Sequence, residues 1–203
     1  MSGRMSQRLV CVVEGKGEVA AVPNLCARIL GELSVWDWFV DPVPIRQSRG
    51  LLVDERVRSS LRPAKDGDFD RAVQLALRSR RADAVLVLCD SDDDCPATWG
   101  PSAMHKLSAI CRGAAVMVQR EYESWLLHGI QAVDLDPGVV ERRRDAKKLL
   151  DRHRPGYKAT SDQLALTRQL DIRRCWARSD SFDKLVRSIA DLTGAIAPER
   201  PRL

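Results

Sequence analysis

The sequence predicts an α/β fold, with a parallel, doubly wound sheet of about four strands and an α-helical C-terminal part. Short runs of apolar residues, which are typical of strands buried on both faces, alternate with segments of helical periodicity up to about residue 130. Beyond Asp134 the apolar runs stop and only helical patterns remain. Because alternating strands and helices build parallel sheets, we expect one sheet covered by helices on both faces.

In the first third of the chain, the apolar run at 9–13 predicts a buried strand. Apolar residues then recur at helical spacing over 22–33, so a helix is expected there, with Pro23 tolerated only in its first turn. The side chains of residues 36–40 alternate enough in polarity to predict a second strand. The segment 45–66 is basic and irregular and predicts a surface loop.

The middle third repeats the pattern of helix and strand. A helix capped by Asp68 is expected over 69–80, followed directly by a strand at 84–89. Pro101 suits the first turn of a helix that reaches about residue 111. A fourth buried strand is expected at 114–118.

The C-terminal part is predicted to be helical. The sequence favours helices at 136–153, 163–170 and 182–192, the last between Ser181 as its cap and Gly194 at its end. We therefore expect an α/β domain over 9–130 and a helical extension over 131–194 packed on it. The two ends, 1–8 and 195–203, are expected to be disordered tails.

Composition excludes several classes of protein. The 203 residues carry a formal net charge of +5, which fits a nucleic-acid partner but is modest for this length. Six cysteines contain no C-x-x-C pair and three histidines share no ligand spacing, so zinc knuckles, thioredoxin motifs and histidine metal sites are not expected. No apolar run approaches the roughly 20 residues of a membrane span, so a cytoplasmic protein without membrane contact is predicted.

Acidic residues follow two of the predicted strands. The run 84–89 ends in Asp90-Ser91-Asp92-Asp93-Asp94, and the run 9–13 ends in Glu14-Gly15-Lys16-Gly17-Glu18. If these strands are neighbours in one sheet, their carboxylates converge at the edge where open α/β sheets bind ligands. A bound divalent cation would offset the repulsion between them, whereas a solvated acidic loop is the simpler alternative.

These residues resemble a known group of domains. Glu-Gly after the first strand and Asp-x-Asp after a later one are similar to the Toprim domain of topoisomerases, bacterial primases and OLD-type nucleases. More narrowly, Val13-Glu14-Gly15-x-x-Glu18, the segment 88–94 and Arg120-Glu121-Tyr122-Glu123-Ser124-Trp125 resemble the Toprim-like family of domain of unknown function 4276. The likeness spans about 9–192, and only the three acidic segments are specific.

The resemblance implies a divalent-metal-dependent nuclease that uses Mg²⁺ or Mn²⁺. It assigns general acid/base work to Glu14 and metal binding to Asp90 and Asp92, with Glu123 as a further ligand that could equally be a surface residue. Phosphodiester hydrolysis with two metal ions requires hard oxygen ligands, and Glu18 or Glu123 would complete the set. A non-catalytic binding module for nucleic acid or protein and a small-molecule phosphoesterase remain as alternatives.

Basic residues indicate where phosphates could bind. Five are candidates, each with a solvated surface residue as the alternative: Lys16, Arg46, Arg49, Arg144 and Lys148. The substrate expected from the resemblance is nucleic acid, and DNA in particular. The chain has no G-x-x-x-x-G-K-[ST] loop, so an ATPase like the one that accompanies OLD-type nucleases would be a separate protein. The resemblance also implies that the two proteins would act together in bacterial genome defence.

Overall fold

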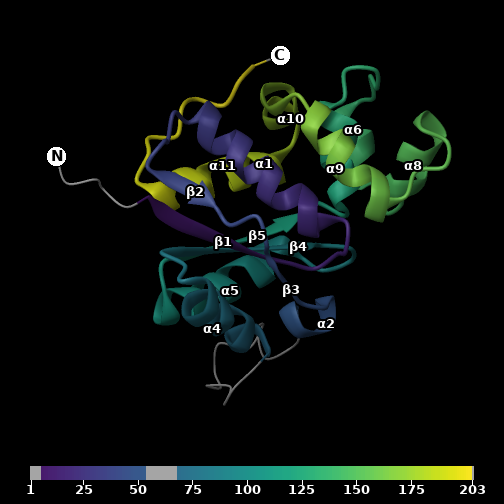
Figure 1. Ribbon diagram of the computed structural model, residues 1–203. Helices are drawn as coiled ribbons and strands as arrows, with labels where there is room; N and C mark the ends of the chain where they lie inside the picture. Colours follow the sequence, from purple (N-terminus) through teal and green to yellow (C-terminus); the bar gives the residue numbers. More distant parts are fainter. Residues whose placement is uncertain (1–5, 54–67, 203) are drawn as a thin grey trace.

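The computed structural model describes residues 6–53 and 68–202, and within them a parallel sheet lies between two layers of helices (Figure 1). The strands are β1 (Gln7–Val13), β2 (Trp38–Val40), β3 (Ile45–Arg46), β4 (Ala84–Asp90) and β5 (Gly113–Val118). Their order is β2-β1-β4-β5, with β3 pairing to the end of β1 beyond β2. All pairings are parallel, which confirms the predicted α/β class.

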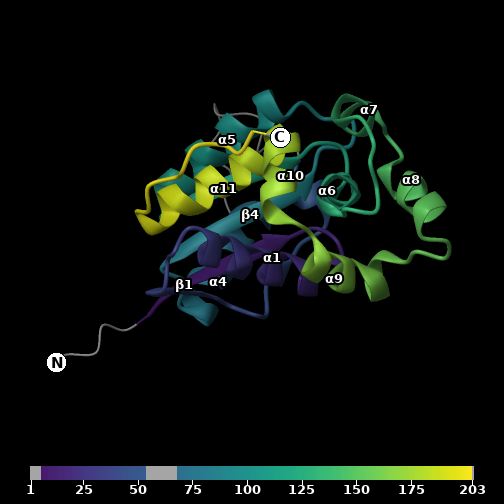
Figure 2. The same ribbon diagram turned by 90° about the horizontal axis from the view of Figure 1, so that it is seen from above.

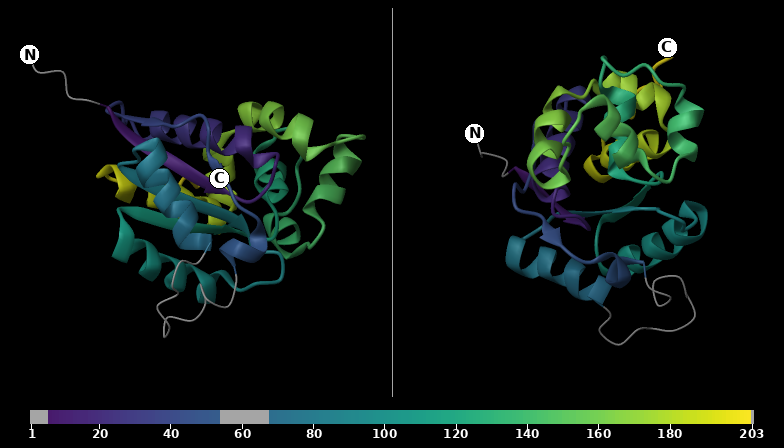
Figure 3. Two further views of the ribbon diagram at one scale, coloured as in Figure 1. Left: turned by 60° about the horizontal axis from the view of Figure 1, so that its bottom comes forward. Right: turned by 90° about the vertical axis from the view of Figure 1, so that its right-hand side faces the viewer.

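The connecting helices cover opposite faces of the sheet. Helix α1 (Glu18–Glu32) lies on one face, whereas α4 (Asp68–Arg80) and α5 (Pro96–Ile110) lie on the other, as Figure 3 shows. The short helix α2 (Arg49–Leu52) follows β3. The chain therefore changes faces and direction between β1 and β4. In open α/β sheets such a switch point is where ligands bind, outside the carboxyl ends of the strands.

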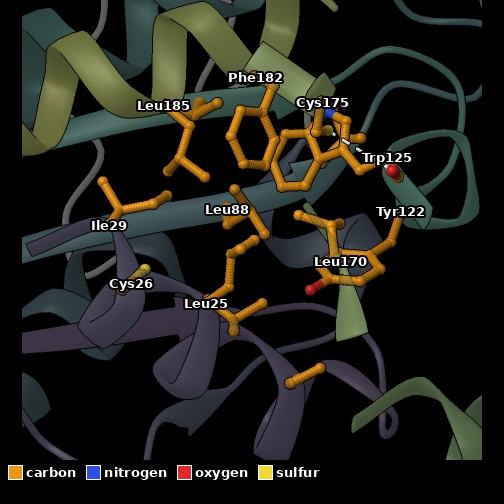
Figure 4. Close-up of a cluster of buried hydrophobic side chains, with 14 of the residues drawn as sticks. Leu25, Cys26, Ile29, Leu88, Tyr122, Trp125, Leu170, Cys175, Phe182 and Leu185 are labelled. Carbon is orange, nitrogen blue, oxygen red and sulfur yellow. Dashed lines mark hydrogen bonds between the residues drawn. The ribbon is translucent and has the colours of Figure 1, made fainter. Parts of the chain in front are cut away.

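Each face of the sheet has its own apolar core. Side chains on one face of β1 and β4, such as Val10 and Val87, pack with α4 and α5. The other face packs against α1 and the C-terminal helices, and Figure 4 shows Leu88 of β4 at the centre of this cluster. There the rings of Trp125 and Phe182 meet edge to face, with centroids 5.2 Å apart.

The part of the chain after β5 is built from helices that share the core of α1 (Figure 2). They are α6 (Tyr122–Gly129), α7 (Pro137–Arg142), α8 (Ala146–His153), α9 (Ala159–Gln169), α10 (Ile172–Arg178) and α11 (Asp180–Thr193). Arg28 of α1 donates hydrogen bonds to the carbonyls of Thr167 and Leu170, at 2.5 and 2.6 Å. These bonds fix the end of α9 against α1. No helix among 6–53 and 68–202 has the length and apolar character that crossing a bilayer requires.

Two prolines lie deeper in helices than the sequence suggested. Pro23 is inside α1, which already begins at Glu18, and the buried side chains around it outweigh the missing backbone hydrogen bond. Pro101 is inside α5, because Pro96 takes the first turn of this helix. The indole of Trp99 donates a 3.0 Å hydrogen bond to the carbonyl of Leu52 and thereby ties this first turn to α2.

The predicted helix 136–153 is two helices with a break at residues 143–145. The carboxylate of Glu121 accepts a 2.8 Å hydrogen bond from the amide of Lys147, and so caps the start of α8 from outside the helix. Helix α11 also begins earlier than expected, because Ser179 rather than Ser181 is its cap.

Parts of the segments that were expected to be tails or a loop form regular structure or specific contacts. Strand β1 begins at Gln7, inside the expected N-terminal tail. Arg200 of the expected C-terminal tail donates hydrogen bonds to the carbonyls of Trp176 and Ala177 and pairs with Asp180 at 2.6 Å. The basic segment 45–66 begins with β3 and α2, and its remainder lies outside the described residues.

Candidate functional site

The candidate site lies at the carboxyl ends of β1 and β4. Val13 is opposite Leu88 in the parallel register, so Glu14 and Asp90 follow at the same edge of the sheet. The amide of Asp90 donates a hydrogen bond to Oε2 of Glu14 over 3.3 Å. The expectation that the two acidic strand ends are neighbours is therefore confirmed. Burial raises the pKa of Glu14 above its usual value, although Arg49 opposes this effect.

Glu18, the first residue of α1, turns back toward the strand end. Its Oε2 accepts hydrogen bonds from the amides of Glu14 and Gly15, at 3.0 and 3.2 Å. A side chain at Gly15 would come within 2.9 Å of Oε1 of Glu18, so glycine is what allows this close approach. Glu18 is only 4% exposed, and burial raises its pKa to about 7.

Asp90 is the least satisfied carboxylate of the site. As a residue it is partly exposed, but its Oδ1 atom is enclosed and accepts no hydrogen bond from the described residues. Burial raises the pKa of Asp90 well above its usual value, and the negative charges of Glu18, Glu123 and Glu14 raise it further. An enclosed oxygen among like charges is costly to ionise unless a cation balances it.

Glu123 reaches the site from α6. It is 5% exposed, and the hydroxyl of Tyr157 donates a 3.0 Å hydrogen bond to its Oε1. Tyr157 comes from the segment between α8 and α9, far from Glu123 in the sequence. Glu121 precedes α6 and caps α8 instead, so these two glutamates, two residues apart, make different contacts.

Arg49, the first residue of α2, lies among the outer carboxylates of the site. Its guanidinium forms ion pairs with Glu14 at 3.6 Å, Asp92 at 3.2 Å and Asp94 at 2.5 Å. It also donates hydrogen bonds to the carbonyls of Ser91, at 2.8 Å, and of Asp90. Arg49 was expected to meet phosphate, whereas its guanidinium is engaged by carboxylates of its own chain.

The backbone adopts an unusual conformation beside these acids. Asp92 and Arg120 both have positive φ, at 45° and 67°, in the region that few residues other than glycine adopt. The amide of Asp92 donates to the carbonyl of Arg120 over 3.0 Å, and Nη1 of Arg120 donates to the carbonyl of Asp92 over 2.6 Å. Such conformations persist where surrounding contacts hold them, and they concentrate at functional sites.

Comparison with known proteins adds one finding. The family described as Domain of unknown function (DUF4276) matches residues 13–190. The chain belongs to this family. No curated protein and no solved structure matches the chain significantly. The matched range of this DUF4276 protein includes the three acidic segments, Arg49 and Tyr157.

The other basic candidates of the DUF4276 chain surround the acidic edge unevenly. Lys16 is exposed in the turn after β1, and Arg46 is exposed on β3. Arg144 lies in the break between α7 and α8, where its Nη2 is 3.0 Å from Oδ1 of Asp93, whereas Lys148 is exposed on α8. Arg144 is thus next to the acidic loop.

The carboxylates are gathered without forming a complete metal centre. Within 6–53 and 68–202, no three His, Cys, Asp or Glu side chains are grouped closely enough to hold a metal ion. Arg49 lies between Glu14 and Asp92, whereas Glu18 accepts hydrogen bonds from amides and Glu123 accepts one from Tyr157. Tyr157 and the contacts of Arg49 are the features that sequence reasoning missed, since neither has a local pattern.

Proposed function

We propose that this protein is a Toprim-type nuclease that hydrolyses phosphodiester bonds with the help of a divalent metal ion. The observation that carries the proposal is the meeting of Glu14, Glu18, Asp90 and Glu123 beside the switch point of the sheet. These acids come from three separate segments, and each of Glu18 and Asp90 has a raised pKa. Groups with strongly shifted pKa values concentrate at functional sites.

The donor set suits Mg²⁺ or Mn²⁺. Carboxylate oxygens are the hard ligands that these ions prefer, and Oδ1 of Asp90 lacks any partner among the described residues. Asp90, Glu18 and Glu123 would hold the ion, and Asp92 would join them only by leaving its ion pair with Arg49. When bound, it would neutralise charge on the scissile phosphate and stabilise the leaving oxygen.

Glu14 is the proposed acid/base residue. It is half-buried, and the amide of Asp90 and the guanidinium of Arg49 hold its carboxylate in place. Its raised pKa brings it closer to neutral pH, where a carboxylate transfers protons more effectively. Glu14 would accept a proton from the attacking water or return one to the leaving oxygen.

The proposed substrate is nucleic acid, and DNA in particular. Exposed Lys16, Arg46 and Lys148, together with Arg144, provide positive charge around the acidic edge. Since Arg49 is engaged by carboxylates, it is not part of this phosphate-binding set. Action with a separate ATPase in bacterial genome defence is part of the same proposal and rests on the resemblance to OLD-type nucleases.

A second candidate is a binding module that holds nucleic acid or protein without cleaving it. The pairing of Arg49 with Glu14, Asp92 and Asp94 favours this alternative, because it neutralises part of the acidic cluster without any metal. A binding module would show no metal-dependent cleavage, and substitution of Glu14 would change only affinity.

Cleavage of plasmid and single-stranded DNA in Mg²⁺ and Mn²⁺ tests the proposal. We expect Glu14→Gln to cleave at least ~100-fold more slowly than the wild type while still binding metal and DNA. Asp90→Ala should abolish cleavage, because it removes an ion ligand. Asp37→Asn, an exposed acid at the opposite end of the sheet, is the control and should cleave normally. Equal rates for the wild type and Asp90→Ala, after identical purification, would rule out the nuclease.

A further inference from the structure

We infer that Arg49 takes the place of a second divalent ion in this site, so that the protein binds one ion per chain instead of two. This inference rests on the proposed metal-dependent function and specifies its cation content. It concerns two groups of carboxylates at the same edge of the sheet. We call Glu14, Asp92 and Asp94 the outer group, and Asp90, Glu18 and Glu123 the inner group.

The outer group already has a cation. The guanidinium of Arg49 lies within 3.6 Å of a carboxylate oxygen of each member, and it also donates to the carbonyls of Asp90 and Ser91. Five oxygen-bearing groups thus surround one positive charge, much as oxygen ligands surround a metal ion. A guanidinium has five N–H donors in a planar fork and stays charged at every physiological pH.

The inner group has no such cation. Glu123 accepts a hydrogen bond from a neutral hydroxyl, and Glu18 accepts from two backbone amides. Oδ1 of Asp90 is enclosed without a partner in the described part of the chain.

The two groups therefore differ in what they still require. A second divalent ion in the outer group would have to displace Arg49 or lie against its positive charge, and like charges at such distances repel strongly. An ion in the inner group would meet only oxygen atoms, although Asp90, Glu18 and Glu123 would have to move closer together to hold it. One metal ion and one arginine then supply the positive charge that two ions supply in two-metal sites.

Titration of the purified full-length protein with Mn²⁺ tests this inference. Calorimetry gives the number of ions bound, and electron paramagnetic resonance distinguishes an isolated Mn²⁺ from a coupled pair. The wild type should bind one ion with an uncoupled spectrum. Arg49→Met, which removes the charge but keeps a long side chain, should bind a second ion and show a coupled pair. Arg49→Lys keeps a positive charge and should remain at one ion.

Arg46→Met is the matched control. It removes one charge from β3, at the same edge, but leaves Arg49 and its carboxylates intact, so it should bind one ion. Circular dichroism shows whether each variant is folded, and Arg49→Gln, a second neutral variant with the same expected count of two ions, replaces Arg49→Met if that variant is not folded. Two ions in the wild type, no ion in it, or the same number in all four proteins would each overturn the inference.

The nuclease proposal fails or survives separately. One ion in the wild type and two in Arg49→Met, without any cleavage, would support the role of Arg49 and reject the nuclease. Metal-dependent cleavage by a wild type with two bound ions would support the nuclease and reject the role of Arg49.

Discussion

The hydroxyl of Tyr157 donates a 3.0 Å hydrogen bond to Oε1 of Glu123, and both side chains are buried. This bond joins the segment after α8 to the start of α6, and it orients a carboxylate of the candidate site. Burial and the neighbouring Glu123 raise the pKa of Tyr157, so its hydroxyl keeps its proton and acts as a donor.

We therefore expect Tyr157→Phe to weaken Mn²⁺ binding several-fold, because Glu123 loses the contact that orients it. The loss of a buried hydrogen bond should also destabilise the protein by about 1–2 kcal/mol. Tyr122→Phe is the matched control, since the hydroxyl of Tyr122 is hydrogen-bonded to Oγ1 of Thr167, at 3.0 Å, and not to a carboxylate. Calorimetry and thermal unfolding measure both effects. Equal losses of Mn²⁺ affinity in the two variants would contradict a role for Tyr157 in orienting Glu123.

Glu18 should make the metal-free protein less stable as pH rises. Its pKa is raised from 4.5 to about 7, so between these values the folded protein retains a proton that the unfolded chain releases. The contribution of Glu18 is fully present below pH 4.5 and is lost as pH approaches and passes 7. Glu18→Gln cannot ionise at this position, so its unfolding free energy should fall less steeply over this window. The difference from the wild type should reach up to about 3 kcal/mol.

Chemical denaturation at several pH values with a chelator present measures this difference. The same pH slope in the wild type and in Glu18→Gln would show that Glu18 ionises normally in the folded protein.

His128 should have the opposite effect. Burial, Arg178 and Arg174 lower its pKa from 6.5 to about 4, and neither ring nitrogen has a partner among the described residues. The folded protein therefore excludes a proton that the unfolded chain binds below pH 6.5. The contribution of His128 is present above that pH and is lost as pH falls toward 4, by up to about 3 kcal/mol.

His128→Leu should flatten this acid-side loss while remaining close to the wild type in its pH dependence above pH 7. Because Glu18 and His128 act in opposite directions over overlapping windows, each variant must be compared with the wild type at every pH. An unchanged acid-side slope in His128→Leu would mean that the imidazole is protonated in the folded protein.

The basic residues near α8 should contribute to DNA binding through salt-sensitive contacts. Arg144→Glu combined with Lys148→Glu should reduce the slope of log affinity against log salt by about 1.8 on duplex DNA, if each residue neutralises one phosphate. Fluorescence anisotropy in the Glu14→Gln background, in which cleavage is expected to be slow, measures the slope. Arg168→Glu combined with Arg173→Glu, at exposed positions on α9 and α10, gives the protein the same net charge and should leave the slope nearly unchanged. An equal effect in both doubles would indicate non-specific attraction.

The sequence by itself determined the sheet and the identity of its acidic edge. Continuous apolar runs such as 84–89 must be buried on both faces, which requires a central position in a parallel sheet. An acid directly after such a run lies at the carboxyl end of the strand whatever the rest of the chain does. The sequence therefore predicted that Glu14 and Asp90 meet if their strands are neighbours, because parallel neighbours end at the same edge, and the pairing of β1 with β4 fulfils that condition.

Only the tertiary structure decided what these carboxylates contact. Arg49 is 41 residues from the carbonyl of Asp90 and 45 from Asp94, and Tyr157 is 34 residues from Glu123. No periodicity or local spacing encodes such pairs, since they arise when separate elements pack against one shared core. The break before α8 has the same origin, because the acceptor that caps Lys147 is Glu121, 26 residues earlier in the chain. Local patterns fix which strand an acid follows, whereas long-range packing fixes which cation or hydrogen-bond donor satisfies it.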